Sequence, residues 1–221
     1  MTTERDMATL IAGNPMLRAC AATTQRSLLE QGELRSFEKD SLLFADDDAG
    51  GKAFFLLHGA LQMLKTTNRG RRQIVCNPNP TTCEGVCMMF FGPRGLAKVR
   101  GVESGQILIV EREQFELLTR QDPAFCEGAW NGVAHCMTHL HNLVSQLSFN
   151  KVAERVVMLL LDDTVKDGDL VRLTQADLAA NVGTTREVVA RCLAGLQADG
   201  LIRLGRGRVT VLHREKLRQQ I

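Results

Sequence analysis

The stretch LTQADLAANVGTTREVVARCLAGLQADG, residues 173–200, constrains the fold of this chain more than any other. Thr174 is suited to cap a first helix over residues 175–181, and Thr184 or Thr185 is suited to cap a second one. Gly183 lies between them and permits a tight turn. Two helices joined by so short a turn predict a helix-turn-helix, whose second helix is free to enter a major groove.

The second helix is expected to have one apolar face and one charged face. Its apolar side chains follow the i, i+3, i+4, i+7 pattern of a buried stripe: Val189, Cys192, Leu193 and Leu196. Arg186, Glu187 and Arg191 fall on the opposite side. Arginine pairs with guanine and glutamate accepts from cytosine, so we predict that these three residues read bases. Thr184-Thr185-Arg186-Glu187 also matches a capping box, in which Glu187 would serve the helix N-terminus.

The segment LIRLGRGRVTVL, which follows Gly200, predicts a two-stranded wing. Its arginines at 203, 206 and 208 are suited to phosphate contacts. The predicted nucleic-acid interface combines the helix pair and the wing: Thr174, Gln175, Thr185, Arg186, Glu187, Arg191 and Arg206.

Residues 34–112 have a different pattern, in which short apolar runs alternate with turn residues such as NRG at 68–70 and NPNP at 77–80. Closely spaced short strands indicate an antiparallel barrel or roll. Within it, FFLLHGALQMLKTTNRGRRQIVC predicts a strand, a glycine turn, a strand, a hairpin and a strand. Helices are expected over residues 4–31, with a break at Asn14-Pro15, and over 112–120.

A long helical stretch opens at Pro123, and a further helix is expected over 151–163. In the first of these, apolar residues recur at alternating intervals of four and three: Cys126, Trp130, Val133, Met137, Leu140, Val144 and Leu147. This narrow a/d pattern with polar flanks predicts a two-helix dimer interface in preference to a helix packed on its own barrel.

The expected fold class is α+β: an N-terminal antiparallel β-roll over 1–122, a dimerisation helix over 123–150 and a winged helix-turn-helix over 151–221. The net charge of +2 excludes a polybasic, histone-like protein. No apolar run reaches the ~18 residues of a membrane span, so we expect a cytoplasmic protein. The seven unevenly spaced cysteines do not form a disulfide framework pattern.

The winged segment LTQADLAANVGTTREVVARCLAGLQADGLIRLGRGRVTVL is similar to the C-terminal domain of the CRP/FNR family of bacterial transcription regulators. TREVVARCL resembles the R-E-x-x-x-R recognition helix of that family, and FFLLHGALQML…NRGRRQIV resembles its β-roll more weakly. The resemblance implies a regulator that is not an enzyme, with Phe149 at the hinge between sensor and DNA-binding domains. It implies palindromic double-stranded DNA as the target and homodimerisation through residues 124–150, and we also expect RNA polymerase as a partner.

The sequence departs from the cyclic-nucleotide-binding members of this family. Those members carry a Gly-Glu pair and, further on, an Arg-Ser pair that holds the cyclic phosphate. Here Glu84-Gly85 is inverted, and Gly95-Leu96 stands in the Arg-Ser place; a leucine cannot ligate a phosphate. Arg94 and Arg100 lack the expected spacing, so we do not expect a cyclic nucleotide. Only Cys20 lies where the oxygen-sensing members have their iron–sulfur cysteines.

The residues VCMM at 86–89 resemble the Cys-Met-His ligand segment of the family's haem-binding members. The resemblance implies Cys87 as a haem thiolate, with Met89 or His135 as candidates for the opposite ligand. An alternative is a metal or metalloid bound by Cys76, Cys83 and Cys87.

Three further alternatives are open for the sensor region. The thiols could form a redox switch, or they could line a pocket for a small organic effector. The last alternative is a cupin-like metalloenzyme with a DNA-binding tail, which needs a histidine-rich metal triad. Residues 34–112 offer only His58.

Overall fold

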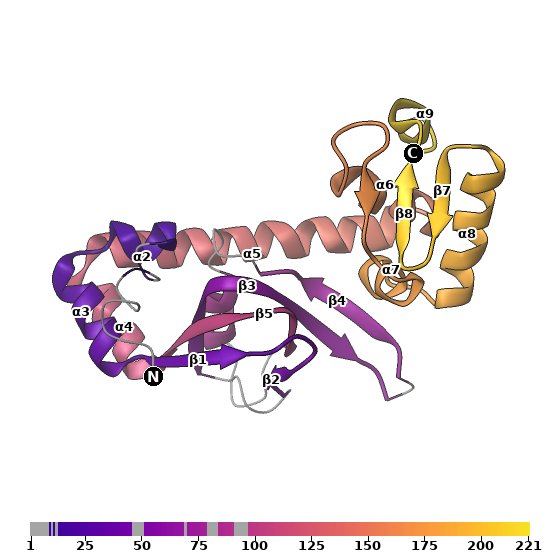
Figure 1. Ribbon diagram of the computed structural model, residues 1–221. Helices are drawn as coiled ribbons and strands as arrows, with labels where there is room; N and C mark the ends of the chain where they lie inside the picture. Colours follow the sequence, from indigo (N-terminus) through magenta and orange to yellow (C-terminus); the bar gives the residue numbers. More distant parts are fainter. Residues whose placement is uncertain are drawn as a thin grey trace. The chain divides into compact units, whose positions relative to one another are not determined.

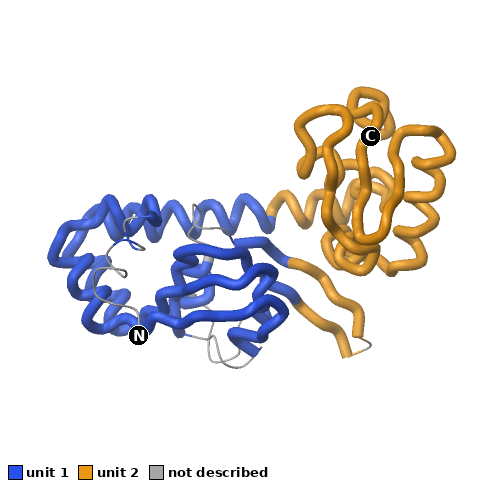
Figure 2. The backbone as a smooth tube through the Cα atoms, viewed as in Figure 1, with its two compact units in different colours: residues 1–64, 75–140 blue, residues 65–74, 141–221 orange. Residues whose placement is uncertain are grey.

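The computed structural model describes residues 9, 11, 13–45, 51–68, 70–78, 84–90 and 97–221, with only the backbone of Glu84 and Phe90. The chain divides into two compact units (Figure 2). The first comprises residues 1–64 and 75–140, and the second comprises residues 65–74 and 141–221. Residues 65–74, the tip of a hairpin, therefore group with the C-terminal part of the chain.

The first unit is built on a five-stranded antiparallel sheet with the order β1-β5-β3-β4, in which β2 also pairs with β5 (Figure 1). Its strands are β1 Glu33–Phe37, β2 Leu42–Phe44, β3 Lys52–Thr66, β4 Arg72–Cys76 and β5 Lys98–Glu111. Together with the helices and the C-terminal helix-turn-helix described below, this sheet confirms the predicted α+β fold class.

The predicted glycine turn in FFLLHGAL is wrong. β3 runs unbroken from Lys52 to Thr66, and its pairing with β5 shifts register on either side of His58. Gly59 takes φ +92°, and a Cβ there would lie 2.7 Å from the carbonyl oxygen of Ser104. The glycine therefore accommodates a bulge against the neighbouring strand where a turn was expected.

Three short helices lie together at one end of the sheet (Figure 1): α2 Pro15–Ala19, α3 Ala22–Gln31 and α4 Arg112–Gln121. Asn14 starts α2 because its side-chain oxygen accepts hydrogen bonds from the backbone N–H groups of Met16 and Leu17. The predicted break at Asn14-Pro15 is thus a helix start, and a second break follows at Cys20 and Ala21. The part of the predicted helix that precedes residue 9 lies outside the described residues.

A 3₁₀ helix, η1 Glu84–Phe90, lies directly on β3. Gly85 makes this close approach possible, since a Cβ there would overlap the carbonyl oxygen of Phe54. Glycine at this position is explained by packing alone.

The long helix α5 Pro123–Phe149 is followed, after Asn150 and Lys151, by α6 Val152–Asp162. Glu154 closes the start of α6, because its carboxylate accepts a 2.8 Å hydrogen bond from the backbone N–H of Lys151. Among the described residues, no helix is long and apolar enough to cross a membrane.

The second unit contains α6 and a helix pair, α7 Gln175–Val182 and α8 Arg186–Ala198, followed by α9 Arg214–Arg218. Its antiparallel sheet has the order β6-β8-β7, with β6 Leu170–Val171, β7 Ile202–Gly205 and β8 Arg208–Val211. β7 and β8 are the predicted wing. The two helices and the wing share one apolar core that includes Leu178, Val189, Leu193 and Val209.

Candidate nucleic-acid interface

Thr174 caps the start of α7, as the sequence predicts, and Asp177 makes the cap reciprocal. The backbone N–H of Asp177 donates to the Thr174 hydroxyl at 3.1 Å, and the backbone N–H of Thr174 donates to the Asp177 carboxylate at 3.3 Å. Gly183 ends the helix in the left-handed conformation, with φ +72°. The predicted cap and turn are both confirmed.

Three consecutive carbonyls at the end of α7 accept hydrogen bonds from side chains outside the helix pair. Gln73 Nε2 donates to Asn181 at 3.2 Å, Arg155 Nε donates to Val182 at 2.8 Å, and Arg71 Nη2 approaches Gly183 at 3.4 Å. The last carbonyls of a helix have no partner within the helix itself. The turn is thus fixed from α6 and from the hairpin tip, and the start of α8 with it.

α8 divides into the two faces that its sequence predicts. Val189, Leu193 and Leu196 are buried in the core of the unit, and Cys192 is half-buried beside them. Arg186, Glu187 and Arg191 are exposed. The charged side chains are therefore available to a partner without any change in packing.

Glu187 has a local role as well. Hydrogen bonds from its own backbone N–H and from the Thr185 side chain lower the pKa of the Glu187 carboxyl below its ordinary value. The N-cap is Thr185, so Glu187 is the second helical residue. The capping box predicted from Thr184 is therefore wrong in register, although the carboxylate does serve the helix start.

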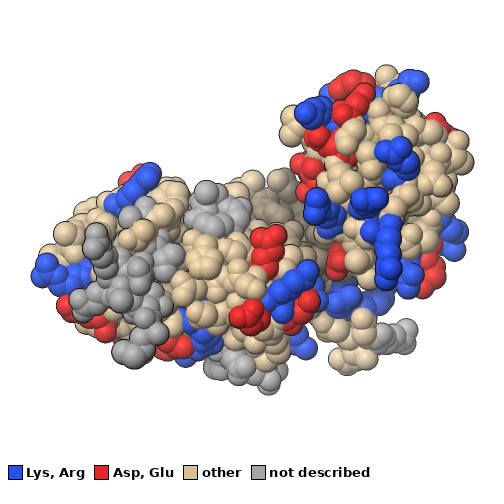
Figure 3. Space-filling view, in the orientation of Figure 1, with Lys and Arg blue, Asp and Glu red and all other residues tan. Residues whose placement is uncertain are grey.

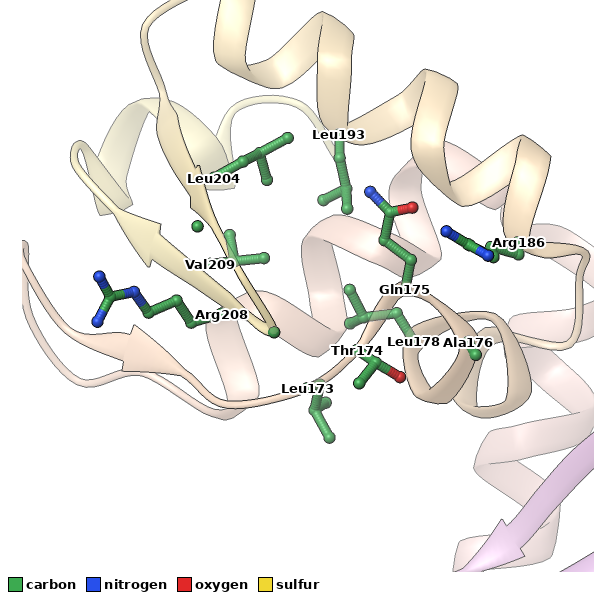
Figure 4. Close-up of a pocket in the computed structure, with 12 residues that line it drawn as sticks. Leu173, Thr174, Gln175, Ala176, Leu178, Arg186, Leu193, Leu204, Arg208 and Val209 are labelled. Atoms are coloured by element: carbon green, nitrogen blue, oxygen red, sulfur yellow. The ribbon is translucent and has the colours of Figure 1, made fainter.

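A cleft of about 380 Å³ lies between α7, α8 and the wing (Figure 4). Gln175 and Arg186 point toward each other near the start of α8, whereas Arg208 projects from β8 away from the cleft. Leu193 and Val209 form part of its apolar wall. The predicted residues Thr174, Gln175 and Arg186 thus line one depression.

The other predicted contact, Arg206, is exposed at the turn between β7 and β8, and Arg203 and Arg208 are also exposed. Figure 3 shows several Lys and Arg side chains on the face of the second unit that it presents. Among the described residues, none of the arginines at 186, 191, 203, 206 and 208 forms an ion pair with a carboxylate. Their positive charge is available to an anionic partner.

The apolar pattern on α5 divides into two rows. Trp130, Met137 and Val144 are 66, 61 and 61% exposed, and Leu147 is 41% exposed. Val133 and Leu140 are partly buried against the core of their own unit. The six predicted interface residues therefore differ in exposure: Trp130, Met137, Val144 and Leu147 are open to solvent, whereas Val133 and Leu140 also pack partly on their own unit.

The predicted haem ligands are not brought together. Cys87 is buried in one core cluster of the first unit and Met89 in the other, while His135 is exposed on α5. The reason is local: a 3₁₀ helix has three residues per turn, so positions two apart point to different sides. As placed, these three residues do not fit a single haem.

Of the predicted metal ligands, Cys76 and Cys87 lie in one buried cluster with Cys136 and Met88. The Cys76 thiol also donates to the Met63 sulfur at 3.2 Å, a neighbour that the sequence pattern did not indicate. Cys83 lies outside the described residues. Within the described ranges, no group of three or more His, Cys, Asp or Glu side chains could hold a metal ion.

Arg94 and Arg100 are the two arginines near the place where relatives hold a cyclic phosphate. Arg100 Nη2 donates to Gln62 Oε1 at 3.1 Å, and its Nη1 lies 3.7 Å from Asp40. Its guanidinium therefore bridges side chains of the first unit. Arg94, Gly95 and Leu96 lie outside the described residues.

The two halves of the chain match two known domain families. Residues 34–122 match the cyclic nucleotide-binding domain, and residues 154–220 match the Crp-like helix-turn-helix domain. The chain is 25% identical over 200 residues to the cyclic AMP receptor protein of Thermus thermophilus, covering 90% of this chain and 93% of that one. It is 23% identical over 197 residues to the global nitrogen regulator of Synechocystis, covering 85% and 88%.

The fold matches that of the c-di-GMP responsive global regulator CLP of Xanthomonas campestris, with a TM-score of 0.78 at 19% identity, over 87% of this chain and 99% of that one. A sensor-type sheet domain joined to a winged helix-turn-helix with an exposed basic recognition helix defines a DNA-binding transcription regulator and not an enzyme. Both domain matches assign the chain to the CRP/FNR family of these regulators.

Proposed function

We propose that this regulator works as a homodimer that reads a two-fold symmetric DNA site. The observation that carries the proposal is the exposure of Arg186, Glu187 and Arg191 on α8, opposite the stripe of Val189, Leu193 and Leu196, which is buried. Bidentate arginine contacts to guanine and a glutamate contact to cytosine are the pairings that such a helix makes in a major groove. We assign contacts to the flanking phosphates to Thr174 and Gln175, which line the cleft at the start of α7, and to the exposed Arg206 in the wing.

The exposed row on α5 supports the dimer. Trp130, Met137 and Val144 are spaced by seven residues, so they form one line along the helix. Exposed large apolar residues in such a line favour packing against the same row of a second copy. A dimer of this kind presents two recognition helices, and we expect half-sites about 34 Å apart. We also propose that the DNA-bound regulator contacts RNA polymerase and that the protein acts in the cytoplasm.

For the sensor, we propose a soft metal or metalloid held by Cys76, Cys83 and Cys87, of which Cys83 lies outside the described residues. The buried thiol and thioether groups around Cys76 are the donors that soft metals prefer. Relatives are named for cyclic AMP, for c-di-GMP and for nitrogen regulation, so the family match does not single out one effector. Haem has less support, since the placement of Cys87, Met89 and His135 does not favour it.

Comparison of Arg186→Ala with Arg206→Ala tests the DNA-reading assignment. A binding site is first selected from a random duplex pool with the parent protein. Arg186→Ala should cost about 1–3 kcal/mol at one base pair of each half-site and relax the preference there. Arg206→Ala should weaken selected and random DNA by the same factor. If Arg186→Ala also weakens both equally, Arg186 contacts phosphate and the base-reading assignment is wrong.

A further inference from the structure

The hairpin between β3 and β4 groups with the DNA-binding unit, although both strands belong to the sheet of the first unit (Figure 2). Its turn is closed by hydrogen bonds from the backbone N–H of Thr67 to the carbonyl of Arg71 at 2.8 Å, and from that of Gly70 to the carbonyl of Thr67 at 2.8 Å. Gly70 takes φ +76°, which suits a glycine. The turn presents Arg71 and Arg72, both exposed.

Two side chains of the hairpin contact the turn of the helix pair. Gln73 donates to the carbonyl of Asn181, and Arg71 approaches that of Gly183. Gly183 leaves room for the first contact, because a Cβ there would lie 2.4 Å from Gln73 Oε1. These contacts place the hairpin tip next to the start of the recognition helix.

A hollow of about 220 Å³ lies where the hairpin meets the helix pair, lined by Arg71 and Arg72 on one side and by Thr184, Thr185 and Arg186 on the other. Three arginines and two threonines thus line one space. Within the described part of the chain, none of the three arginines forms an ion pair with a carboxylate. Three positive charges around one hollow are suited to a phosphate group.

We propose that Arg71 and Arg72 of the hairpin bind the DNA backbone beside the recognition helix, as a third contact element in addition to the helix pair and the wing. The proposal rests on the DNA-reading function proposed above. It adds a phosphate contact beside the start of α8, made from the strands that also form the sensor sheet. Because a phosphate contact carries no base information, this element contributes affinity and position and no sequence preference.

The test compares the dependence of DNA binding on salt concentration in Arg71→Ala/Arg72→Ala and in the parent, on the selected duplex and on a random one. Each lost phosphate contact lowers the magnitude of the slope of log K against log salt by about 0.9, so a homodimer that loses one contact at each of its two hairpins should lose about 1.8. Both duplexes should be weakened by the same factor. Arg71→Lys/Arg72→Lys keeps both charges and should stay within about 0.9 of the parent slope.

Arg18→Ala/Arg26→Ala is the matched control, because it removes the same charge from exposed positions on α2 and α3. Its slope should equal that of the parent. A parental slope in the Arg71→Ala/Arg72→Ala variant would overturn the proposal, and so would tighter binding, which would mean that the hairpin obstructs DNA. Base-specific loss in Arg186→Ala shows in either case that the DNA-reading function itself holds.

Discussion

The side chain of Arg155 joins the end of α5 to the turn of the helix-turn-helix: its Nε donates to the carbonyl of Val182 and its Nη1 to that of Asn150, both at 2.8 Å. Arg155 is only 9% exposed, so both carbonyls depend on it in a largely dry environment. One charged group thereby links the hinge that follows the long helix to the residue before Gly183.

Arg155→Met should destabilise the DNA-binding unit by about 2–4 kcal/mol, because it leaves one buried and one partly buried carbonyl without their charged donor while keeping the aliphatic volume. Denaturant unfolding measures the loss. Arg172→Met, at an exposed position, should change the free energy of unfolding by less than about 0.5 kcal/mol. Equal stability of the two variants would show that water replaces the guanidinium.

Met137→Asp/Val144→Asp should convert the dimer to a monomer, since two charges would enter an apolar contact at a cost of several kcal/mol, on the order of 3–5. Sedimentation equilibrium measures the association. Val165→Asp, at a position 87% exposed in the second unit, brings the same kind of charge and should leave the dimer unchanged. Persistence of the dimer in the double variant would exclude the exposed row of α5 as the interface.

The recognition helix could be predicted because the evidence for it is local. The buried stripe of Val189, Leu193 and Leu196 and the Thr174 cap depend on residues within a few positions of one another. The bulge at Gly59 could not be predicted in the same way, because it depends on the carbonyl of Ser104 in another strand. The hairpin contacts to Asn181 and Gly183 span 108 and 112 residues, and only the fold brings them together. NRGRR, the basic turn at 68–72, was the only local signal.

The same distinction applies to the sensor residues. The spacing of the seven apolar residues on α5 is visible in the sequence, but which row faces its own unit is decided by contacts with the sheet. Cys87 and Met89 look like a ligand pair only if their helix type is ignored. The 3₁₀ geometry of η1 sends them into separate clusters.

The first unit should lose stability at acidic pH through Asp122. Burial raises the pKa of this carboxyl, but hydrogen bonds from the Thr24 side chain and from the backbone N–H groups of Ala21, Phe125 and Ala124 outweigh it, and the net pKa is lowered. The ionised form is therefore favoured in the folded state. Its contribution is complete above the unfolded pKa of about 3.9 and is lost as pH falls through the lower folded value.

Asp122→Asn should accordingly be less stable than the parent at pH 7, and the difference should shrink as the pH falls below about 4. Thermal unfolding between pH 7 and pH 3 measures the two curves. Glu30→Gln, at an exposed position on α3, is the control and should run parallel to the parent. A stability difference between Asp122→Asn and the parent that stays constant down to pH 3 would show that protonation of Asp122 does not cause the acid destabilisation.

Gly59→Ala should destabilise the sheet more than Gly70→Ala. Both glycines have positive φ, so either substitution costs about 1 kcal/mol of backbone strain. At Gly59 the added methyl group would also meet the Ser104 carbonyl oxygen at 2.7 Å, whereas nothing lies within 4 Å of a Cβ at Gly70. Denaturant unfolding compares the two variants, and the extra loss of stability in Gly59→Ala measures the steric clash with Ser104. Equal losses would show that the bulge relaxes to accommodate the methyl group.

The sensor prediction concerns the buried sulfur cluster around Cys76, where its thiol lies 3.2 Å from the Met63 sulfur and Cys87 belongs to the same core. Thiolate and thioether groups select soft cations, and removing a ligand should weaken binding by more than about tenfold. Anaerobic titration with Cu(I) against a chromophoric chelator measures this affinity, and binding to the selected DNA duplex is followed in parallel.

Cys76→Ser and Cys87→Ser should each lose high-affinity Cu(I) binding and the response of DNA binding to the metal, whereas Cys192→Ser on α8 should lose neither. A Soret band in the purified parent would restore haem as the cofactor, and Cys76→Ser and Cys87→Ser variants that respond as the parent does would assign the thiols to packing alone.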